Sequence, residues 1–249
     1  MESDPALGSV GFTDGELYDS ARPDYPEVAL DYFVDKLSLD SSTSAIDLGA
    51  GTGIFSRQIA PRVGSLIAIE PSASMRATFR RNLPHVPLAS GSDVSIPLPT
   101  GSTDVVFVAQ AFHWFTLPDA LHEIARVLKS DGHLALIWNE RDESVEWVHD
   151  VSQAMRWDAM QPYPVGKDFT AELASGPFVD IERRMFRHVQ TLDHDSLLRR
   201  VSSTSYIVAM ETAERDRLME SVREVVDQLP TRIELPYMTD TYVASVSAV

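Results

Sequence analysis

The residues best suited to chemistry lie in the segment Leu48-Gly49-Ala50-Gly51-Thr52-Gly53. The segment follows a short apolar run at 45–48 and precedes a helical pattern over 54–60. Glycines at a strand-to-helix turn let the backbone approach a ligand closely, and the helix N-terminus that follows offers free N–H groups. The spacing therefore predicts a binding site for a small polar ligand.

The carboxylate of Glu70 indicates a ligand that contains a ribose. Glu70 ends the next apolar run, 17 residues beyond Gly53, where a carboxylate can accept both hydroxyls of a ribose. A dinucleotide fingerprint requires Gly-x-Gly-x-x-Gly, but the sixth position counted from Gly49 is Ile54. The third glycine, Gly53, comes one position too early for this fingerprint, which weakens the interpretation as an NAD(P) site. The role of Glu70 in binding a ribose holds whether or not the ligand is a dinucleotide.

Composition and charge exclude other kinds of chemistry. The chain has 249 residues and a formal net charge of -16, so we expect no nucleic-acid partner. It has no Cys, which excludes disulfides and thiolate chemistry, and its histidines lack metal-ligand spacing, so we expect no metal. The acidic N-terminus and the lack of a run of about 18 apolar residues predict a soluble, cytoplasmic protein without a membrane span. The sequence has no coiled-coil pattern, so it leaves the oligomeric state open.

Strand and helix patterns alternate around the glycine segment. Apolar runs suited to buried strands lie at 45–48, 65–70, 86–89, 104–110 and 133–138. Apolar residues recur at helical spacing over 117–128, and Asp131-Gly132 is predicted to separate this helix from the next strand. The alternation predicts a parallel sheet with crossover helices.

The pattern changes after Asn139. Residues 140–175 are charged, aromatic and interrupted by proline, with a helix predicted from about 144 to 160, so we expect a cap insertion. The composition then predicts a strand over 179–191, helices over 195–209 and 212–229, and a strand over 237–249 that closes the sheet.

The motif Asp47-x-Gly49-x-Gly51-x-Gly53, together with Glu70, resembles motifs I and II of the class I S-adenosylmethionine-dependent methyltransferases. Three further segments resemble that family in the same order, namely 70–75 after strand two, 101–106 at the start of strand four and 126–134 before strand five. The resemblance implies a Rossmann-like α/β fold with a seven-stranded, mostly parallel sheet, an antiparallel C-terminal strand and a helical cap insertion.

Within this family the chain is similar to the small-molecule branch that includes trans-aconitate methyltransferase. The likeness is carried by Tyr18-x-x-x-Arg22-Pro23-x-Tyr25-Pro26, by Gln110-Ala111-Phe112-His113-Trp114-Phe115 and by Leu235-Pro236-Tyr237-x-Thr239. We expect one methyltransferase domain over 1–249. Its expected parts are an N-terminal lid and first helix (1–40), a cofactor-binding core (41–139), a cap insertion (140–178) and C-terminal strands and helices (179–249).

The resemblance implies S-adenosylmethionine as the cofactor and gives individual residues roles. Asp47 favours the cationic amino group, Glu70 holds the ribose and Met75 covers the adenine. The expected cofactor-binding residues are Tyr18, Arg22, Asp47, Gly49, Gly51, Gly53, Glu70, Pro71, Met75, Ser92, Asp93 and Gln110. The sequence departs from the family at Ser92-Asp93-Val94, where Asp93 serves the adenine through its carboxylate or through its backbone.

Methyl transfer requires positioning and exclusion of water more than a nucleophilic side chain. His113 follows strand four, where ligands of open α/β sheets gather, and is the expected catalytic residue. It acts as a general base for a thiol, hydroxyl or amine acceptor, or it only packs beneath Trp114; a carboxylate acceptor needs no base. Tyr25, Trp114 and Trp138 are the expected contacts to a small-molecule acceptor.

Two further questions stay open at this stage. The arginines at 183, 184, 187, 199 and 200 either attract an anionic acceptor or are solvated charges that balance an acidic chain. A protein with these motifs also has an alternative function, in which it binds the cofactor for a cyclisation or a regulatory role without transferring a methyl group.

Overall fold

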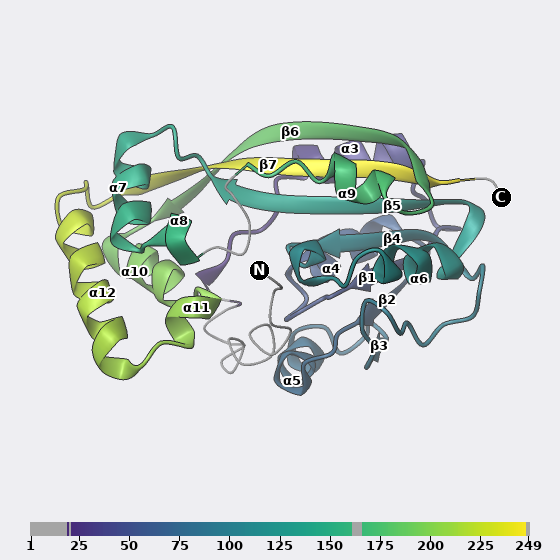
Figure 1. Cartoon of the computed structure of the whole chain (residues 1–249), viewed down its shortest axis with the longest axis horizontal. Helices are drawn as coiled ribbons and strands as arrows, with labels where there is room; N and C mark the ends of the chain where they lie inside the picture. Colours follow the sequence, from purple (N-terminus) through teal and green to yellow (C-terminus); the bar gives the residue numbers. More distant parts are fainter. Residues whose placement is uncertain (1–18, 20, 161–165, 248–249) are drawn as a thin grey trace. The chain divides into compact units, whose positions relative to one another are not determined.

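A computed structural model of the chain describes residue 19, residues 21–160 and residues 166–247 (Figure 1). The helices are α3 (Glu27–Leu37), α4 (Ile54–Ile59), α5 (Ala73–Asn82), α6 (Asp119–Val127), α7 (Glu146–Ala154), α8 (Trp157–Met160), α9 (Thr170–Ala174), α10 (His194–Ser202), α11 (Ser205–Val208) and α12 (Thr212–Val226), with short 3-10 turns at η1 (Ala60–Arg62) and η2 (Phe112–Trp114). The strands are β1 (Ser44–Leu48), β2 (Ser65–Ile69), β3 (Leu88–Ala89), β4 (Thr103–Ala109), β5 (Leu128–Arg141), β6 (Phe178–Leu192) and β7 (Ile233–Val246).

The strands form one seven-stranded sheet in the order β3-β2-β1-β4-β5-β7-β6. β1 pairs in parallel with β2 and β4, β2 with β3, and β4 with β5. β7 runs against β5, because Asp142 N–H donates to Pro236 O at 3.0 Å while Asn139, earlier in β5, meets Thr239, later in β7. The predicted α/β fold, with its mostly parallel sheet and antiparallel C-terminal strand, is confirmed.

The chain divides into two compact units, which we call the sheet unit and the helical unit. The sheet unit comprises Asp24–Asn139, Asp168–Phe186 and Thr239–Val249. The helical unit comprises Met1–Pro23, Glu140–Lys167 and Arg187–Met238.

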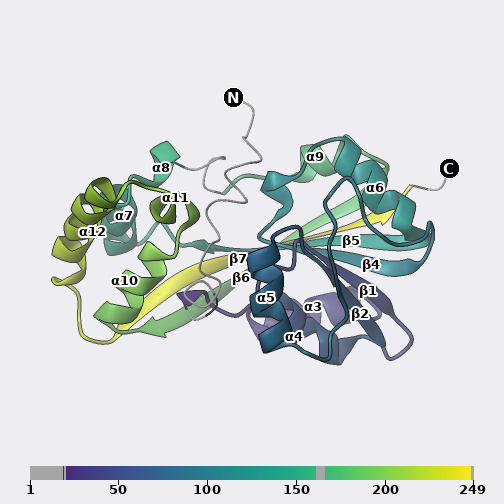
Figure 2. The same ribbon diagram turned by 90° about the horizontal axis from the view of Figure 1, so that it is seen from below.

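In the sheet unit, helices cover both faces of the strands. Figure 2 shows α3, α4 and α5 on one face and α6 and α9 on the other. Strands covered on both faces read as continuous apolar runs, and all of 105–108 in β4 is buried. The rings of Phe33, Phe55 and Phe107 pack together between α3, α4 and β4, with centroids 5.7 Å and 5.3 Å from Phe107.

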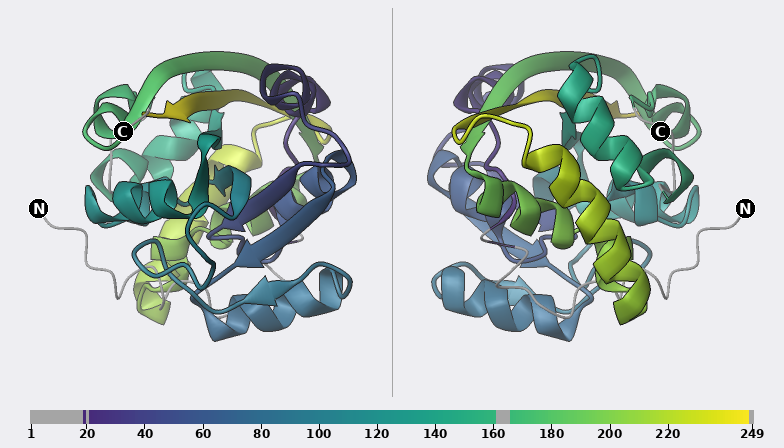
Figure 3. Two further views of the ribbon diagram at one scale, coloured as in Figure 1. Left: turned by 90° about the vertical axis from the view of Figure 1, so that its right-hand side faces the viewer. Right: turned by 90° about the vertical axis from the view of Figure 1, so that its left-hand side faces the viewer.

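The helical unit has an apolar core of its own. α12 packs against α7 and α10, as the right-hand view of Figure 3 shows. Val148, Leu197 and Val222, one from each of these helices, are all buried in that core.

Several predicted boundaries were wrong, each because of a tertiary or backbone feature. β5 begins at Leu128, since Leu128 pairs with Thr103 ahead of an irregularity in the register, so Asp131-Gly132 lies inside the strand. The helix predicted over 144–160 is divided into α7 and α8, because Arg156 between them has a φ of 55°. β7 begins at Ile233 rather than at 237.

Candidate functional site

The glycine loop joins β1 to α4 and depends on left-handed backbone. Gly49, Gly51 and Gly53 have φ values of 76°, 57° and 94°, a region that residues with a side chain rarely adopt. Gly49 N–H donates to Ile69 O at 2.8 Å, which ties the loop to the end of β2. The loop is therefore held in a shape that only glycine adopts at low cost.

The three glycines differ in how much room there is for a side chain at their Cα atoms. A Cβ at Gly49 would lie 2.7 Å from Cβ of Ala111, and a Cβ at Gly53 would lie 2.7 Å from Leu83. A Cβ at Gly51 would meet nothing within 4 Å among the described residues. Packing thus explains Gly49 and Gly53, whereas Gly51 faces open space that a ligand can fill.

Asp47, at the end of β1, is wholly buried. Its Oδ2 accepts a 2.5 Å hydrogen bond from Ser56 Oγ on α4, and its Oδ1 has no hydrogen-bond partner within the described chain. Burial raises the pKa of Asp47 to about 7. The hydrogen bond from Ser56 opposes this rise, and the negative charge of the neighbouring Glu70 adds to it. An unpartnered buried carboxylate oxygen is unfavourable by itself and fits a ligand with a cationic amino group.

Glu70 follows β2 and holds the glycine loop. Its Oε2 accepts the backbone N–H of Gly51 at 2.8 Å, and its Oε1 accepts that of Ser72 at 2.7 Å. Burial raises the pKa of Glu70, and these two backbone hydrogen bonds oppose the rise. An ionised carboxylate has about four acceptor positions, so both oxygens can still accept ribose hydroxyls.

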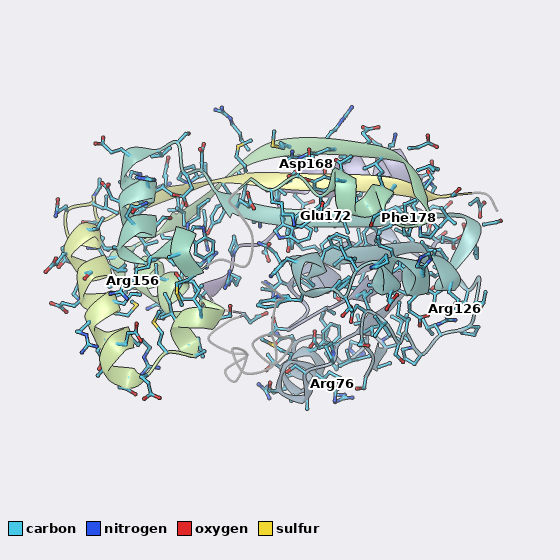
Figure 4. The ribbon with its side chains drawn as sticks, viewed as in Figure 1. Arg76, Arg126, Arg156, Asp168, Glu172 and Phe178 are labelled. Atoms are coloured by element: carbon cyan, nitrogen blue, oxygen red, sulfur yellow. The ribbon has the colours of Figure 1, made fainter. Side chains whose placement is uncertain are left out.

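The segment after Glu70 starts α5. Ser72 is the N-cap of α5, and its Oγ accepts the backbone N–H of Met75 at 3.4 Å. Arg76, labelled in Figure 4, donates to the carbonyl oxygens of Glu70 and Pro71 at 2.8 Å and 2.6 Å. Met75 is only 2% exposed, so its side chain is packed inside the protein in the absence of a ligand.

Ser92 and Asp93 lie in a turn after β3. Ser92 N–H and Ser95 N–H each donate to the other residue's carbonyl, at 3.1 Å and 3.2 Å. The Asp93 carboxylate accepts the backbone N–H of Thr116 at 2.6 Å, which joins the turn to the segment before α6. That carboxylate therefore already has a structural partner.

Gln110 follows β4 with a φ of 56°, which is strained for a residue with a side chain. Its Nε2 donates to Asn139 O at 2.9 Å. Asn139 in turn donates to Asp24 O at 3.2 Å and accepts from Thr239 Oγ1 at 2.6 Å. Asn139 is not among the residues predicted from the sequence, although its position near the carboxyl end of β5 was a usable signal.

The residues expected near the acceptor form an aromatic cluster in the sheet unit. The His113 ring lies 4.8 Å from that of Trp114 and 6.1 Å from that of Trp138. Trp138 stacks on Phe169 at 4.8 Å, and Phe169 packs against Phe112 at 5.6 Å. The structure brings these three predicted residues together and adds Phe169, one of the aromatic residues of the segment expected to form the cap, for which the sequence left open a place in an acceptor pocket or in the cap's own core.

Three predicted site residues, Tyr18, Arg22 and Tyr25, lie in the segment expected to form the N-terminal lid. Tyr18 lies outside the described residues. Arg22 belongs to the helical unit, where it donates to Ser203 O at 3.4 Å. Tyr25 belongs to the sheet unit, where its backbone bonds twice to the Gln58 side chain and its ring meets Phe55 edge-on.

Two other kinds of feature are absent from the described part of the chain. In residues 21–160 and 166–247, no group of His, Asp and Glu side chains is arranged to hold a metal ion. None of the described helices is long and apolar enough to cross a membrane.

A glycine loop after the first strand, an acid after the second and a mixed sheet in this order define a Rossmann-like α/β protein. Proteins of this class generally bind nucleoside ligands at the carboxyl ends of their strands.

Comparisons with known proteins identify the family. A model of the methyltransferase domain matches residues 46–136. An uncharacterized methyltransferase of Schizosaccharomyces pombe, C25B8.09, is 34% identical over 226 residues, with 90% of both chains covered. Two solved structures have a TM-score of 0.57. YcgJ of Bacillus subtilis is 18% identical in sequence, and the match covers 89% of this chain and 99% of that chain. The [4+2]-cyclase SpnF is 15% identical, and the match covers 92% of this chain and 84% of that chain. The chain belongs to the methyltransferase family, and its cofactor is S-adenosylmethionine.

Proposed function

We propose that this protein transfers a methyl group from S-adenosylmethionine to a small-molecule acceptor, with the cofactor held by the glycine loop of the sheet unit. The observation that carries the proposal is the wholly buried Asp47 of β1, whose Oδ1 lacks a partner within the described chain, just before the glycine loop with its open space at Gly51. A cofactor with a positively charged amino group supplies the missing partner.

The groups in and beside the glycine loop have separate tasks. Asp47 Oδ1 accepts from the cofactor's amino group, Gly51 leaves room for the methionine end, and Glu70 accepts the ribose hydroxyls while it keeps the loop closed. Bound S-adenosylmethionine supplies a methyl group on a positively charged sulfur. The protein's contribution is to orient the cofactor and acceptor and to exclude water.

His113 is the proposed acid–base group. With a thiol, hydroxyl or amine acceptor, one ring nitrogen of His113 takes the acceptor's proton; with a carboxylate acceptor it has no proton to take. The aromatic cluster of His113, Trp114 and Trp138 supports this proposal, because His113 and Trp114 follow β4 and Trp138 lies near the carboxyl end of β5 in the sheet unit.

Titration calorimetry tests the cofactor site. S-adenosylmethionine should bind saturably, and Glu70→Ala should weaken binding about tenfold or more, because hydrogen bonds to a charged group are lost. Glu70→Gln, which keeps the shape of the side chain, should weaken it less. Glu220→Ala, at an exposed position of α12, is the matched control and should change nothing. Absence of saturable binding by the unaltered protein contradicts the proposal.

A second function is favoured by one comparison, since SpnF is named a [4+2]-cyclase and shares the fold. A fold hosts more than one chemistry, so the fold alone does not distinguish methyl transfer from cyclisation. Release of S-adenosylhomocysteine in the presence of an acceptor supports methyl transfer. Cofactor that stays bound and unconsumed in every acceptor reaction supports the second function.

The finer features of the assignment are also proposals. The segments at 18–26, 110–115 and 235–239 support membership of the branch that includes trans-aconitate methyltransferase. The net charge of -16 supports an acceptor that is not a nucleic acid, and the cytoplasm is the proposed compartment.

A further inference from the structure

Three parts of the sheet unit that are remote in sequence are joined at one buried residue, Asn139, near the carboxyl end of β5. Its Nδ2 donates to the backbone carbonyl of Asp24 at 3.2 Å, and its Oδ1 accepts from the hydroxyl of Thr239 on β7 at 2.6 Å. Its backbone carbonyl accepts from Gln110 Nε2 at 2.9 Å. Because β5 lies between β4 and β7 in the sheet, Asn139 connects the strands on either side of its own (Figure 1).

The chemistry of these partners fixes the orientation of both amide side chains. A backbone carbonyl only accepts hydrogen bonds, so the NH2 group of Asn139 must face Asp24 and its oxygen must face Thr239. The Thr239 hydroxyl is then the donor, and it comes from a wholly buried residue. For the same reason Gln110 presents its NH2 group to Asn139, and its Oε1 accepts no hydrogen bond from the described residues. Gln110 thus keeps one acceptor oxygen for a ligand.

Gln110 is held in a conformation that it would not favour by itself. Its φ of 56° lies in the left-handed region, which is unfavourable for a residue with a side chain. Its N–H donates to Ile137 O at 3.0 Å, and its side chain donates to Asn139, so β5 holds both its backbone and its side chain. Strained residues persist only where their surroundings hold them, and they gather at ligand sites.

The turn at Gln110 lies against the glycine loop. The next residue, Ala111, is so close to Gly49 that a Cβ on that glycine would lie 2.7 Å from Ala111 Cβ. A displacement of this turn would therefore change the space in which the cofactor is proposed to bind.

The Asp24 side of Asn139 also leads to the glycine loop. Tyr25, which follows Asp24, exchanges two backbone hydrogen bonds with the side chain of Gln58, each at 2.8 Å. Gln58 lies on α4, the helix that begins directly after the loop. Asn139 is therefore bonded to two segments that contact the loop or the helix that follows it.

We propose that Asn139 and Thr239 are positioning residues for S-adenosylmethionine that act through Gln110, an inference that rests on the function proposed above. Thr239 and Asp24 fix the side chain of Asn139, and with it the backbone carbonyl that holds Gln110. Gln110 in turn offers its Oε1 to an N–H or O–H group of the cofactor. Asn139 and Thr239 do not touch the cofactor; they keep Gln110 in the arrangement that binds it.

Titration calorimetry with S-adenosylmethionine, paired with thermal unfolding of each full-length variant, tests the proposal. Thr239→Val removes the hydroxyl with little change of volume and leaves Asn139 Oδ1 without its donor. It should weaken cofactor binding about three- to tenfold, which corresponds to the contribution of one hydrogen bond. Thr239→Ser keeps a hydroxyl and should bind the cofactor within about twofold of the unaltered protein.

Thr241→Val is the matched control. Thr241 is also wholly buried on β7, and its hydroxyl also donates to a backbone carbonyl, that of Arg184, at 2.9 Å. Because each variant loses one buried hydrogen bond, Thr241→Val should lower Tm about as much as Thr239→Val does. It should keep the cofactor affinity of the unaltered protein.

A double-mutant cycle measures whether Thr239 acts through Gln110. Gln110→Met removes the amide and should itself weaken cofactor binding. When Gln110 is already replaced by Met, Thr239→Val should cause no further loss of affinity. Asn139→Asp loses the donor to Asp24 but keeps the acceptor for Thr239, and it should also weaken binding. It replaces Thr239→Val in the comparison with Thr241→Val if Thr239→Val does not fold.

Equal cofactor affinities of Thr239→Val and Thr241→Val overturn the proposal, as do fully additive losses of affinity in the cycle. An Asn139→Asp variant that binds as tightly as the unaltered protein overturns it as well. Each of these results leaves methyl transfer intact, because the unaltered protein still binds the cofactor saturably. Absence of saturable binding by the unaltered protein defeats the proposed function and the positioning roles together.

Discussion

Asp47 combines complete burial with a carboxylate oxygen that the described chain leaves unpartnered, so its protonation should respond to the cofactor. In the free protein burial raises its pKa to about 7, so the carboxyl is largely protonated at pH 5 to 6. A cationic amino group beside Oδ1 favours the ionised form and lowers that pKa in the complex. Binding therefore releases a proton below about pH 7.

We predict that the affinity for S-adenosylmethionine rises severalfold from about pH 5 to about pH 7 and then levels off. Calorimetry in two buffers with different ionisation enthalpies measures the proton released. Asp47→Asn should weaken binding and flatten this pH dependence. A pH profile of Asp47→Asn that parallels that of the unaltered protein would place the titrating group elsewhere.

Gly51 offers a matched comparison with Gly101. Both have positive φ, 57° and 65°, and a Cβ on either would meet no described atom within 4 Å. Gly51→Ala and Gly101→Ala should therefore lose a similar stability, about 1 kcal/mol, from backbone strain. Only Gly51→Ala should reduce cofactor affinity, because its methyl group enters the proposed binding space. Thermal unfolding and calorimetry on both variants check this; equal affinities contradict the proposed place of the cofactor.

At the scale of elements, Arg126 of α6 ties the segment between β3 and β4 to the helix (Figure 4). It donates to both oxygens of Glu123, at 2.7 Å and 2.8 Å, and to the carbonyl oxygens of Ile96 and Leu98 at 3.0 Å and 2.9 Å. The same segment carries Ser92 and Asp93, so α6 helps to hold the turn proposed to face the adenine.

We predict that Arg126→Met lowers the free energy of unfolding by about 1–2 kcal/mol, since its carbonyl hydrogen bonds are lost while part of the ion pair is already screened by water. Chemical denaturation measures the loss. Arg80→Met, at an exposed position of α5, is the control and should fall within about 0.5 kcal/mol of the unaltered protein. Equal stability of the two variants contradicts the role of Arg126.

At the scale of the whole molecule, the proposed cofactor site lies within the sheet unit, while the helical unit has its own apolar core. We predict that S-adenosylhomocysteine slows amide hydrogen exchange in 47–56 and 68–75 more than in α12. Exchange followed by mass spectrometry measures this, and Glu70→Ala should diminish the effect. Uniform protection of both units would contradict a site confined to the glycine loop.

The features of this protein that depend on local pattern could be predicted from the residues alone. Glycines 49, 51 and 53 after an apolar run predicted a strand, a ligand-binding turn and a helix, and Glu70 followed from the next run. These predictions were possible because a buried parallel strand and a left-handed turn each require particular residue types within a few positions.

Which distant residues share an environment depends on how the chain folds. Gln110 after β4 and Thr239 of β7 are far apart in the sequence but both bond to Asn139 of β5, and Arg141 and Arg200 are buried within one helical unit. The sequence left Arg200 between an anion site and a solvated charge, and it gave no sign of Arg141. Burial depends on which elements pack over a side chain, and a polar residue at a strand end carries no local pattern that specifies its neighbours.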